Sequence, residues 1–261
     1  MTATVDAALM ALANRLADRA GGIIRRYFRQ KIAIDDKEDS SPVTLADREV
    51  ESELRQIIEN ECPAHGIIGE EHGALRADAE YVWVIDPIDG TKSFISGIPI
   101  FGTLIALTRK GVPILGVIDQ PISRERWLGA LGHPTTLNGT PIHTRSCAGL
   151  ASASLYATTP DMFQGGDAAG FAKLSGAVKR RCFGADCYAY GLLALGCIDL
   201  VAEASMKIYD YLAMVPIVEG AGGIITDWEG RKLTLESGSR VIACGDKSLS
   251  GPARALLTES I

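Results

Sequence analysis

The first sixty residues show two helical patterns separated by a polar segment. Between residues 5 and 28, apolar side chains recur at intervals of three, four and seven residues, namely Leu9, Leu12, Leu16, Ile23 and Tyr27. This spacing places them on one face and predicts an amphipathic helix. A second helix is predicted from about residue 46 to residue 60. The segment 29–43 between them is rich in turn formers and predicts a mobile loop or a short hairpin.

Short apolar runs then predict a series of strands up to about residue 140. The clearest is Tyr81 to Ile85, an unbroken apolar run of the kind expected for a buried strand. Further strands are expected at 66–69, 103–108, 112–118 and 127–131. The second and third of these predict a hairpin, so this half is expected to place helices on a mostly antiparallel sheet.

Strands and helices alternate more evenly in the second half of the chain, which is typical of an α/β layer. The predicted strands lie at 152–158, 178–183, 199–204, 223–227 and 240–244, and the predicted helices near 167–176, 186–195, 210–221 and 247–258. A turn at residues 138–141 separates the two halves, without a repeat or a low-complexity linker. The halves 1–140 and 141–261 are therefore expected to form one continuous body.

Composition limits the classes of function. The 261 residues are 47% hydrophobic and include 28 glycines, as expected for a globular α/β protein with many tight turns. The formal net charge of −6 argues against a nucleic-acid partner, because a nucleic-acid backbone favours a basic face. An acidic chain can still bind a phosphate ester when cations intervene.

Three features bear on the compartment. No stretch reaches the ~18 apolar residues that a membrane-spanning helix needs, so no membrane partner is expected. The N-terminus lacks the basic region of a secretory signal. The six cysteines contain no C-x-x-C pair, and we interpret them as reduced thiols of a cytoplasmic protein.

The strand at 81–85 runs directly into two aspartates, Asp86 and Asp89, which are followed by Gly90 and Thr91. Carboxylates at a strand end, beside the N–H groups of a helix start, can hold divalent cations and a phosphate together. Asp-Pro and Asp-Gly are also ordinary turn dipeptides, and aspartate is an ordinary helix cap. The motif indicates metal-assisted phosphoryl chemistry once other carboxylates are considered with it.

Two further carboxylates and one carbonyl group are candidates for the same cations. Glu70 ends the short strand before it, Asp210 begins a predicted helix, and the Ile88 carbonyl lies between the two aspartates. Hard cations such as Mg²⁺ take oxygen ligands from several chain segments. The alternatives are a solvated acidic turn at Glu70 and Glu71, and a helix N-cap at Asp210.

Thr44 and Asp47 have the spacing of a capping box, with aspartate in place of glutamate or glutamine. That interpretation is structural. In a functional interpretation, Asp47 polarises the Thr91 hydroxyl, which in turn orients a metal-bound water. Local spacing does not favour the second interpretation, and both stay open.

These segments together match a known pattern. Residues Trp83 to Phe94 are similar to the motif W-x-I-D-P-[IL]-D-G-T-x-N-F, with Ser93 in place of the usual asparagine. The remaining matches are Gly69-Glu70-Glu71, Pro42 to Asp47, and Asp210 with Gly222-Gly223 twelve residues later. Since the matches cover most of the chain, it resembles the inositol monophosphatase family.

The resemblance implies an α/β (α+β) fold, a layered α-β-α-β-α sandwich of the inositol monophosphatase and fructose-1,6-bisphosphatase type. It also implies Mg²⁺-dependent hydrolysis of a phosphate monoester by in-line attack of a metal-activated water. Two or three Mg²⁺ per site are implied. The first would be held by Glu70, Asp86 and the Ile88 carbonyl, and the second by Asp86, Asp89 and Asp210. Glu70 would also contribute to a weaker third site. The implied catalytic residues are Glu70, Thr91 and Asp47, and the Gly90 and Thr91 amides would cradle the phosphate.

Two acids beyond the metal set bear on the substrate. Glu203 matches a position that reaches the substrate hydroxyls in inositol phosphatases. Asp186, in the loop Gly184-Ala185-Asp186, is a carboxylate where those enzymes have a small neutral residue. If Asp186 faces the site, the two acids form an anionic recess suited to a leaving group with an ammonium. Otherwise Asp186 caps the helix predicted at 186–195.

Substrate contacts are therefore predicted for Gly90, Thr91, Gly184, Asp186, Glu203 and Asp210. Segments 94–107 and 186–204 resemble the histidinol-phosphatase branch of the family, which implies L-histidinol phosphate as substrate and a place in histidine biosynthesis. The alternatives are an inositol-1-monophosphatase of broad specificity, a 3′-phosphonucleotide phosphatase, and a non-catalytic relative that binds a partner protein. The last would lack part of the metal set, which is complete here. By analogy with the family, a homodimer is expected.

Overall fold

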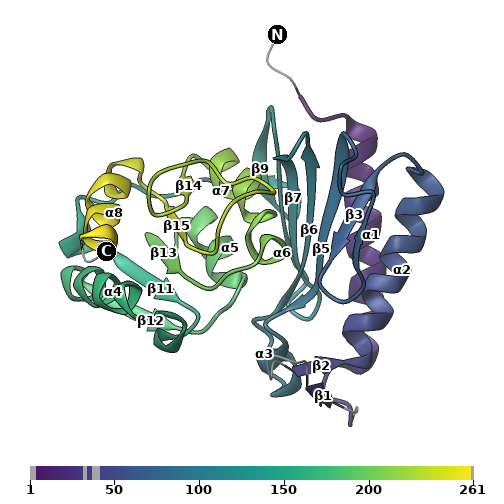
Figure 1. Cartoon of the computed structure of the whole chain (residues 1–261), viewed down its shortest axis with the longest axis horizontal. Helices are drawn as coiled ribbons and strands as arrows, with labels where there is room; N and C mark the ends of the chain where they lie inside the picture. The colour runs from purple at the N-terminus through teal and green to yellow at the C-terminus, as the bar shows by residue number, and fades with distance from the viewer. Residues whose placement is uncertain (1–3, 32–33, 37–41, 260–261) are drawn as a thin grey trace.

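A computed structural model describes residues 4–31, 34–36 and 42–259 of the chain. Its elements form five layers in the order helix, sheet, helix, sheet, helix (Figure 1). The α-β-α-β-α sandwich implied by the resemblance is therefore confirmed.

The larger sheet has eight strands in the order β10-β9-β8-β7-β6-β5-β3-β4. Only β3 and β5 pair in parallel; every other neighbouring pair within this sheet is antiparallel. The strands are β3 (Gly66–Gly69), β4 (Gly73–Leu75), β5 (Tyr81–Asp89), β6 (Gly102–Arg109), β7 (Val112–Gln120), β8 (Glu125–Ala130), β9 (His133–Leu137) and β10 (Thr140–Pro141). The predicted hairpin is β6–β7. Strands β4, β9 and β10 were not predicted; they are short and lie at or near the sheet edges.

Two long helices cover the outer face of this sheet, on the right in Figure 1. Helix α1 (Ala7–Tyr27) begins after Asp6, whose carboxylate accepts a hydrogen bond from the Ala8 N–H at 2.9 Å. It buries Leu12, Leu16 and Ile23, so the predicted apolar face is confirmed. Helix α2 (Leu45–Glu61) lies beside it and packs on the same core.

The smaller sheet has five strands in the order β12-β11-β13-β15-β14. It is mixed, because β11 runs parallel to both of its neighbours and β15 antiparallel to both of its own. The strands are β11 (Ser154–Ala157), β12 (Arg180–Phe183), β13 (Leu200–Glu203), β14 (Ile224–Thr226) and β15 (Val241–Cys244). Helices α4 (Gly166–Ala177) and α8 (Ser250–Thr258) cover its outer face.

Three short helices fill the middle layer: α5 (Tyr188–Ala194), α6 (Ile208–Tyr211) and α7 (Met214–Gly220). Their apolar side chains share one buried cluster with both sheets, for example Tyr190 with Val84 and Val201. This cluster contains residues from both sides of the predicted boundary near residue 140.

The prediction of one helix over 210–221 is wrong. Helix α6 begins earlier, at Ile208, and ends at Tyr211, while α7 begins only at Met214. Pro216 explains the break, since it has no N–H to donate to the Leu212 carbonyl and its ring would clash with that group.

The segment between α1 and α2 contains β1 (Ile34–Asp36) and β2 (Pro42–Thr44), which pair antiparallel. The hairpin alternative for segment 29–43 is confirmed for these strands, while residues 37–41 lie outside the described part of the chain. None of the helices that the described residues form has both the length and the apolar composition of a membrane-crossing helix.

Candidate metal centre

The end of β5 is shaped by a β-bulge. Asp86 pairs with Leu104 and Asp89 with Gly102, so the register shifts between the two aspartates. The predicted strand therefore continues four residues further than its apolar run and includes both acids. The turn is held from inside, because the buried Thr103 hydroxyl donates to the Pro87 carbonyl at 2.8 Å. A bulge of this kind re-aims side chains at a functional site.

Three carboxylates converge at this turn. One oxygen from each of Asp86, Asp89 and Asp210 lies within 4.8 Å of the others. Asp210 arrives from helix α6, where its carboxylate accepts a hydrogen bond from the Lys207 N–H at 2.7 Å. The N-cap of that helix is Lys207, so the interpretation of Asp210 as the N-cap is wrong.

Burial and mutual repulsion govern the ionisation of these acids. Burial, together with Glu70, Asp89 and Asp210, raises the pKa of Asp86 well above its ordinary value. Burial and the negative charges of Asp186 and Asp210 raise the pKa of Asp89 in the same way. Burial, with Glu70 and Glu203, raises the pKa of Asp210 to about 7.

This donor set fits Mg²⁺. Its members are all carboxylates, the hard oxygen ligands that this cation prefers, and they come from separate chain segments. Buried acids that repel one another are stabilised in their ionised form when a divalent cation lies between them.

Glu70 follows β3, beside the end of β5, where its N–H donates to the Ile85 carbonyl at 3.3 Å. Its turn is anchored by Glu51 of α2, which sequence reasoning missed. The buried Glu51 carboxylate accepts hydrogen bonds from the Glu71 N–H at 2.6 Å and the His72 N–H at 3.0 Å. The sequence contains a weak indication of this role, because Glu51 lies four residues after Asp47 and therefore on the same face of the helix.

Gly69 is required by this anchor. A Cβ on Gly69 would lie 2.0 Å from the Glu51 carboxylate, closer than real contacts allow. The glycine of the Gly-Glu-Glu motif therefore makes room for the side chain that fixes the acidic turn.

Thr44 and Asp47 form the predicted capping box. The Asp47 carboxylate accepts hydrogen bonds from the Thr44 N–H at 2.8 Å and from the Thr44 hydroxyl at 2.6 Å. Burial raises the pKa of Asp47 to about 6, against these hydrogen bonds. The Thr91 hydroxyl donates instead to the Ile88 carbonyl at 3.1 Å. A direct Asp47–Thr91 interaction therefore stays a prediction.

A cavity of about 330 Å³ opens over the acid cluster. Its lining includes Glu70, Asp86, Ile88, Asp89, Gly90, Thr91, Asp186, Glu203 and Asp210. The structure thus brings together most of the predicted site residues. Gly184 is not part of this lining, and its amide donates to the Ala157 and Thr158 carbonyls; its contact with substrate stays a prediction.

Asp186 points into this cavity rather than capping a helix. Helix α5 begins at Tyr188 with Cys187 as N-cap, so the interpretation of Asp186 as N-cap is wrong. Its carboxylate accepts a hydrogen bond from the Ser93 hydroxyl at 2.8 Å. It also lies over Gly90, whose φ is +85° and where a Cβ would lie 2.6 Å from the carboxylate. Only glycine fits there without strain.

Glu203 also lines this cavity. It is fully buried at the end of β13 and accepts hydrogen bonds from the Thr158 N–H at 3.0 Å and the Tyr190 hydroxyl at 3.1 Å. Burial raises its pKa to about 7, although these hydrogen bonds favour the charged form. Both acids of the predicted anionic recess therefore line one cavity with the metal cluster.

One positioning group could not be found from the sequence. The Cys187 N–H donates to the Asp89 carboxylate at 2.6 Å, across 98 residues of chain. Because a backbone amide belongs to every residue except proline, its role shows only once the fold has placed it.

Comparison with known proteins agrees with this geometry. A model of the inositol monophosphatase family matches residues 6–260. The chain is 51% identical over 248 residues to the bifunctional phosphatase IMPL2, chloroplastic, of Arabidopsis thaliana, covering 92% of this chain and 72% of that protein. It is 38% identical over 227 residues to a histidinol-phosphatase of Mycobacterium tuberculosis, covering 84% and 87%. A solved structure of an inositol monophosphatase from Zymomonas mobilis matches with a TM-score of 0.88 and 51% identity, covering 95% and 96%.

Proposed function

Because the chain belongs to the inositol monophosphatase family, it is a metal-dependent phosphoric monoester hydrolase, and we propose that its substrate is L-histidinol phosphate. The observation that carries the proposal is the pair of carboxylates beside the metal cluster. Asp186, from the loop before α5, and Glu203, at the end of β13, both line the cavity and leave it strongly anionic. A leaving group with an ammonium would form charge-assisted hydrogen bonds there, whereas a neutral polyol would gain little.

The relatives support a substrate of this class. The Mycobacterium tuberculosis protein is a histidinol-phosphatase, and the Arabidopsis thaliana protein is a bifunctional phosphatase. The second candidate is hydrolysis of inositol 1-phosphate, and it is favoured by the equally similar inositol monophosphatase from Zymomonas mobilis.

In this proposal, two sets of oxygen ligands would each hold one Mg²⁺. One set is Glu70, Asp86 and the Ile88 carbonyl, and the other is Asp86, Asp89 and Asp210. Glu70 would also serve a third, weaker site. When bound, Mg²⁺ acts as a Lewis acid and offsets the negative charge of the phosphate. The family's dependence on Mg²⁺ and the acid cluster of this chain support the assignment.

The protein groups around the cations have separate tasks. We assign the Gly90 and Thr91 N–H groups, at the start of α3 (Thr91–Ile95), to the phosphate oxygens. Thr91 and Asp47, with Glu70, would orient the attacking water. Asp186 and Glu203 would bind the leaving alcohol, and Gly184 would shape the loop that carries Asp186.

The test compares kcat/KM for L-histidinol phosphate and D-myo-inositol 1-phosphate with Mg²⁺ in excess. We expect a preference of ~100-fold for histidinol phosphate, about 2.7 kcal/mol of differential transition-state binding. Equal kcat/KM values, or a preference for inositol 1-phosphate, would leave the assignment as a phosphatase in place and reject histidinol phosphate as the preferred substrate.

Asp186→Asn tests the recess itself. Asparagine keeps an acceptor for the Ser93 hydroxyl but removes the charge, so kcat/KM for histidinol phosphate is expected to fall at least 10-fold, with a much smaller change for inositol 1-phosphate. Asp78→Asn is the matched control, since Asp78 is exposed and lies away from the cavity. An equal fall for both substrates would assign Asp186 a structural role only.

Three further expectations belong to this proposal. We expect a homodimer, a cytoplasmic location, and two halves that move as one body, as the shared core between the sheets supports. Light scattering coupled to size-exclusion chromatography tests the first of these.

A further inference from the structure

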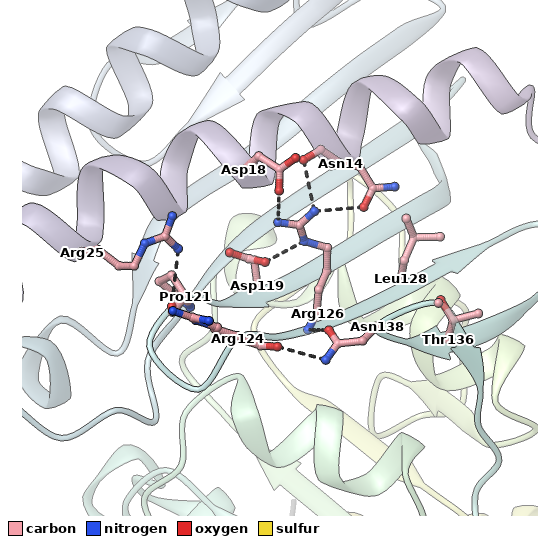
Figure 2. Close-up of a pocket in the computed structure, with 11 residues that line it drawn as sticks. Asn14, Asp18, Arg25, Asp119, Pro121, Arg124, Arg126, Leu128, Thr136 and Asn138 are labelled. Atoms are coloured by element: carbon pink, nitrogen blue, oxygen red, sulfur yellow. Dashed lines mark hydrogen bonds and ion pairs between the residues drawn. The ribbon is translucent and has the colours of Figure 1, made fainter.

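A second cavity lies on the opposite face of the eight-stranded sheet from the helices of the middle layer. It is about 570 Å³ in volume and lies between α1 and the ends of β7, β8 and β9 (Figure 2). Its polar lining includes Arg25, Asp119, Arg124 and Arg126, and none of the residues that line it also lines the metal cavity.

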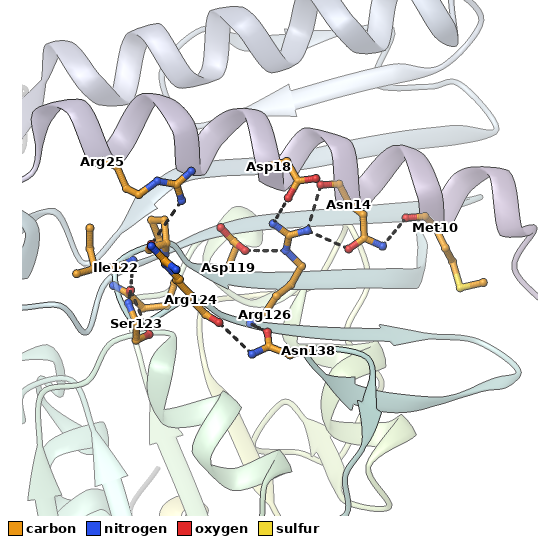
Figure 3. Close-up of polar contacts among 12 residues, drawn as sticks. Met10, Asn14, Asp18, Arg25, Asp119, Ile122, Ser123, Arg124, Arg126 and Asn138 are labelled. Carbon is orange, nitrogen blue, oxygen red and sulfur yellow. Dashed lines mark hydrogen bonds and ion pairs between the residues drawn. The ribbon is translucent and has the colours of Figure 1, made fainter.

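The floor of this cavity is a closed network of charges (Figure 3). Arg126 donates to the buried Asp119 carboxylate at 2.6 Å and to Asp18 of α1 at 2.7 Å. Its remaining Nη1 donates to the backbone and side-chain oxygens of Asn14, at 3.2 Å and 3.1 Å. Arg126 therefore pairs with both acids of the cavity, and these contacts use four of its five N–H donors.

Two other arginines remain. Figure 2 shows Arg25 reaching from α1 toward the turn that carries Arg124. Arg25 makes one long hydrogen bond, 3.5 Å to the Pro121 carbonyl. The Arg124 guanidinium forms no hydrogen bond or ion pair with any residue in the described ranges, although its backbone is fixed by the Asn138 amide, which donates to the Arg124 carbonyl at 2.9 Å.

The charge balance points to an anionic ligand. The lining contains three arginines and two aspartates, a surplus of positive charge in a chain whose formal net charge is −6. The guanidinium groups of Arg25 and Arg124 each offer several N–H donors in a planar fork that matches a carboxylate or a phosphate. A volume of this size is in the range of small-molecule sites.

We propose that this cavity is a second binding site, for a small dianion that carries carboxylate or phosphate groups. Arg25 and Arg124 bind the anion from two sides, while the Arg126 network holds α1 and the sheet at a fixed separation. The site is distinct from the metal cavity, whose acids would repel an anion in the absence of cations.

The test is calorimetric titration of the full chain, saturated with Mg²⁺, with succinate as the dicarboxylate probe and sulfate as the phosphate-like probe. Arg25→Gln/Arg124→Gln is compared with wild type and with Arg180→Gln, a control at an exposed arginine on β12 in the other sheet. Since Arg25 and Arg124 are exposed, the double variant is expected to keep its fold and its melting temperature. Any binding at the metal centre is common to all three proteins and cancels in the comparison.

We expect one saturable site whose Kd rises at least 10-fold in the double variant and is unchanged in Arg180→Gln. Acetate, a monoanion, should bind at least 10-fold more weakly than succinate to the wild-type protein. Equal affinities in the three proteins, or an absence of saturable binding of either probe, would overturn the proposal.

Discussion

Removing the Thr103 hydroxyl should weaken Mg²⁺ binding without touching a ligand. Thr103 is fully buried on β6 and donates to the carbonyl of Pro87, which lies between Asp86 and Asp89. Thr103→Val keeps the shape of the side chain and removes the hydrogen bond to that carbonyl. The bulged turn then loses a restraint from inside, and its two carboxylates lose part of their fixed geometry.

The expected magnitudes follow from the contact. Loss of one buried hydrogen bond of 2.8 Å should lower the free energy of unfolding by about 1–3 kcal/mol. Groups that orient metal ligands typically change metal affinity or activity by about 10–100-fold. We expect the Mg²⁺ concentration for half-maximal phosphate release to rise ~10-fold in Thr103→Val. In Thr103→Ser, which keeps a hydroxyl, this concentration should stay close to the wild-type value.

Strand β6 supplies a matched control. Thr108 is also fully buried and donates to a β5 carbonyl, that of Val82, at 3.2 Å, but at the far end of the strand. Thr108→Val should lower the melting temperature by a similar amount and leave the Mg²⁺ dependence unchanged. If the two valine variants shift the Mg²⁺ midpoint equally, the positioning role of Thr103 is refuted and only a stability effect remains.

Two further predictions concern the metal centre. Asp89→Asn should leave the circular dichroism spectrum unchanged yet remove most phosphatase activity, since it weakens one cation site; near-normal turnover at saturating Mg²⁺ would contradict the ligand assignment. Mg²⁺ at ~100 times its Kd should stabilise the wild-type fold by about 2.7 kcal/mol, which calorimetry would register as a rise of roughly 5–10 °C in melting temperature. A much smaller rise is expected for Asp89→Asn, and an equal rise in both proteins would speak against a site at this cluster.

Local periodicity predicted most of the elements, because it reports directly on burial. The apolar face of α1 and the unbroken run of β5 are both set by side chains that must leave water, so neighbouring residues carry the whole signal. The break between α6 and α7 was missed although its cause, Pro216, is local. The apolar pattern of 210–221 continues through both helices, and it conceals the missing backbone hydrogen bond.

The acids of the candidate site could be predicted from the sequence, but the groups that position them could not. Carboxylates at strand ends are visible along the chain, as with Asp86 and Asp89. The groups that hold them are a hydroxyl on the next strand and the amide of Cys187, and neither residue type signals such a role by itself. The alternative roles of Asp186 were likewise undecided, because a turn before a helix looks the same whether its carboxylate turns toward the helix or toward a cavity.

Two segments of the sequence form the site, and each has a different functional role. Residues 70–91 supply the acidic turn, the bulge and the N–H groups assigned to phosphate, whereas residues 158–206 supply the walls proposed to contact the leaving alcohol. Asp210 follows the second segment in the sequence but belongs by chemistry to the first. Substitutions in the walls can therefore alter which alcohol is released while the hydrolytic chemistry is inherited intact, so that one ancestral catalyst could diversify its substrates without passing through an inactive intermediate.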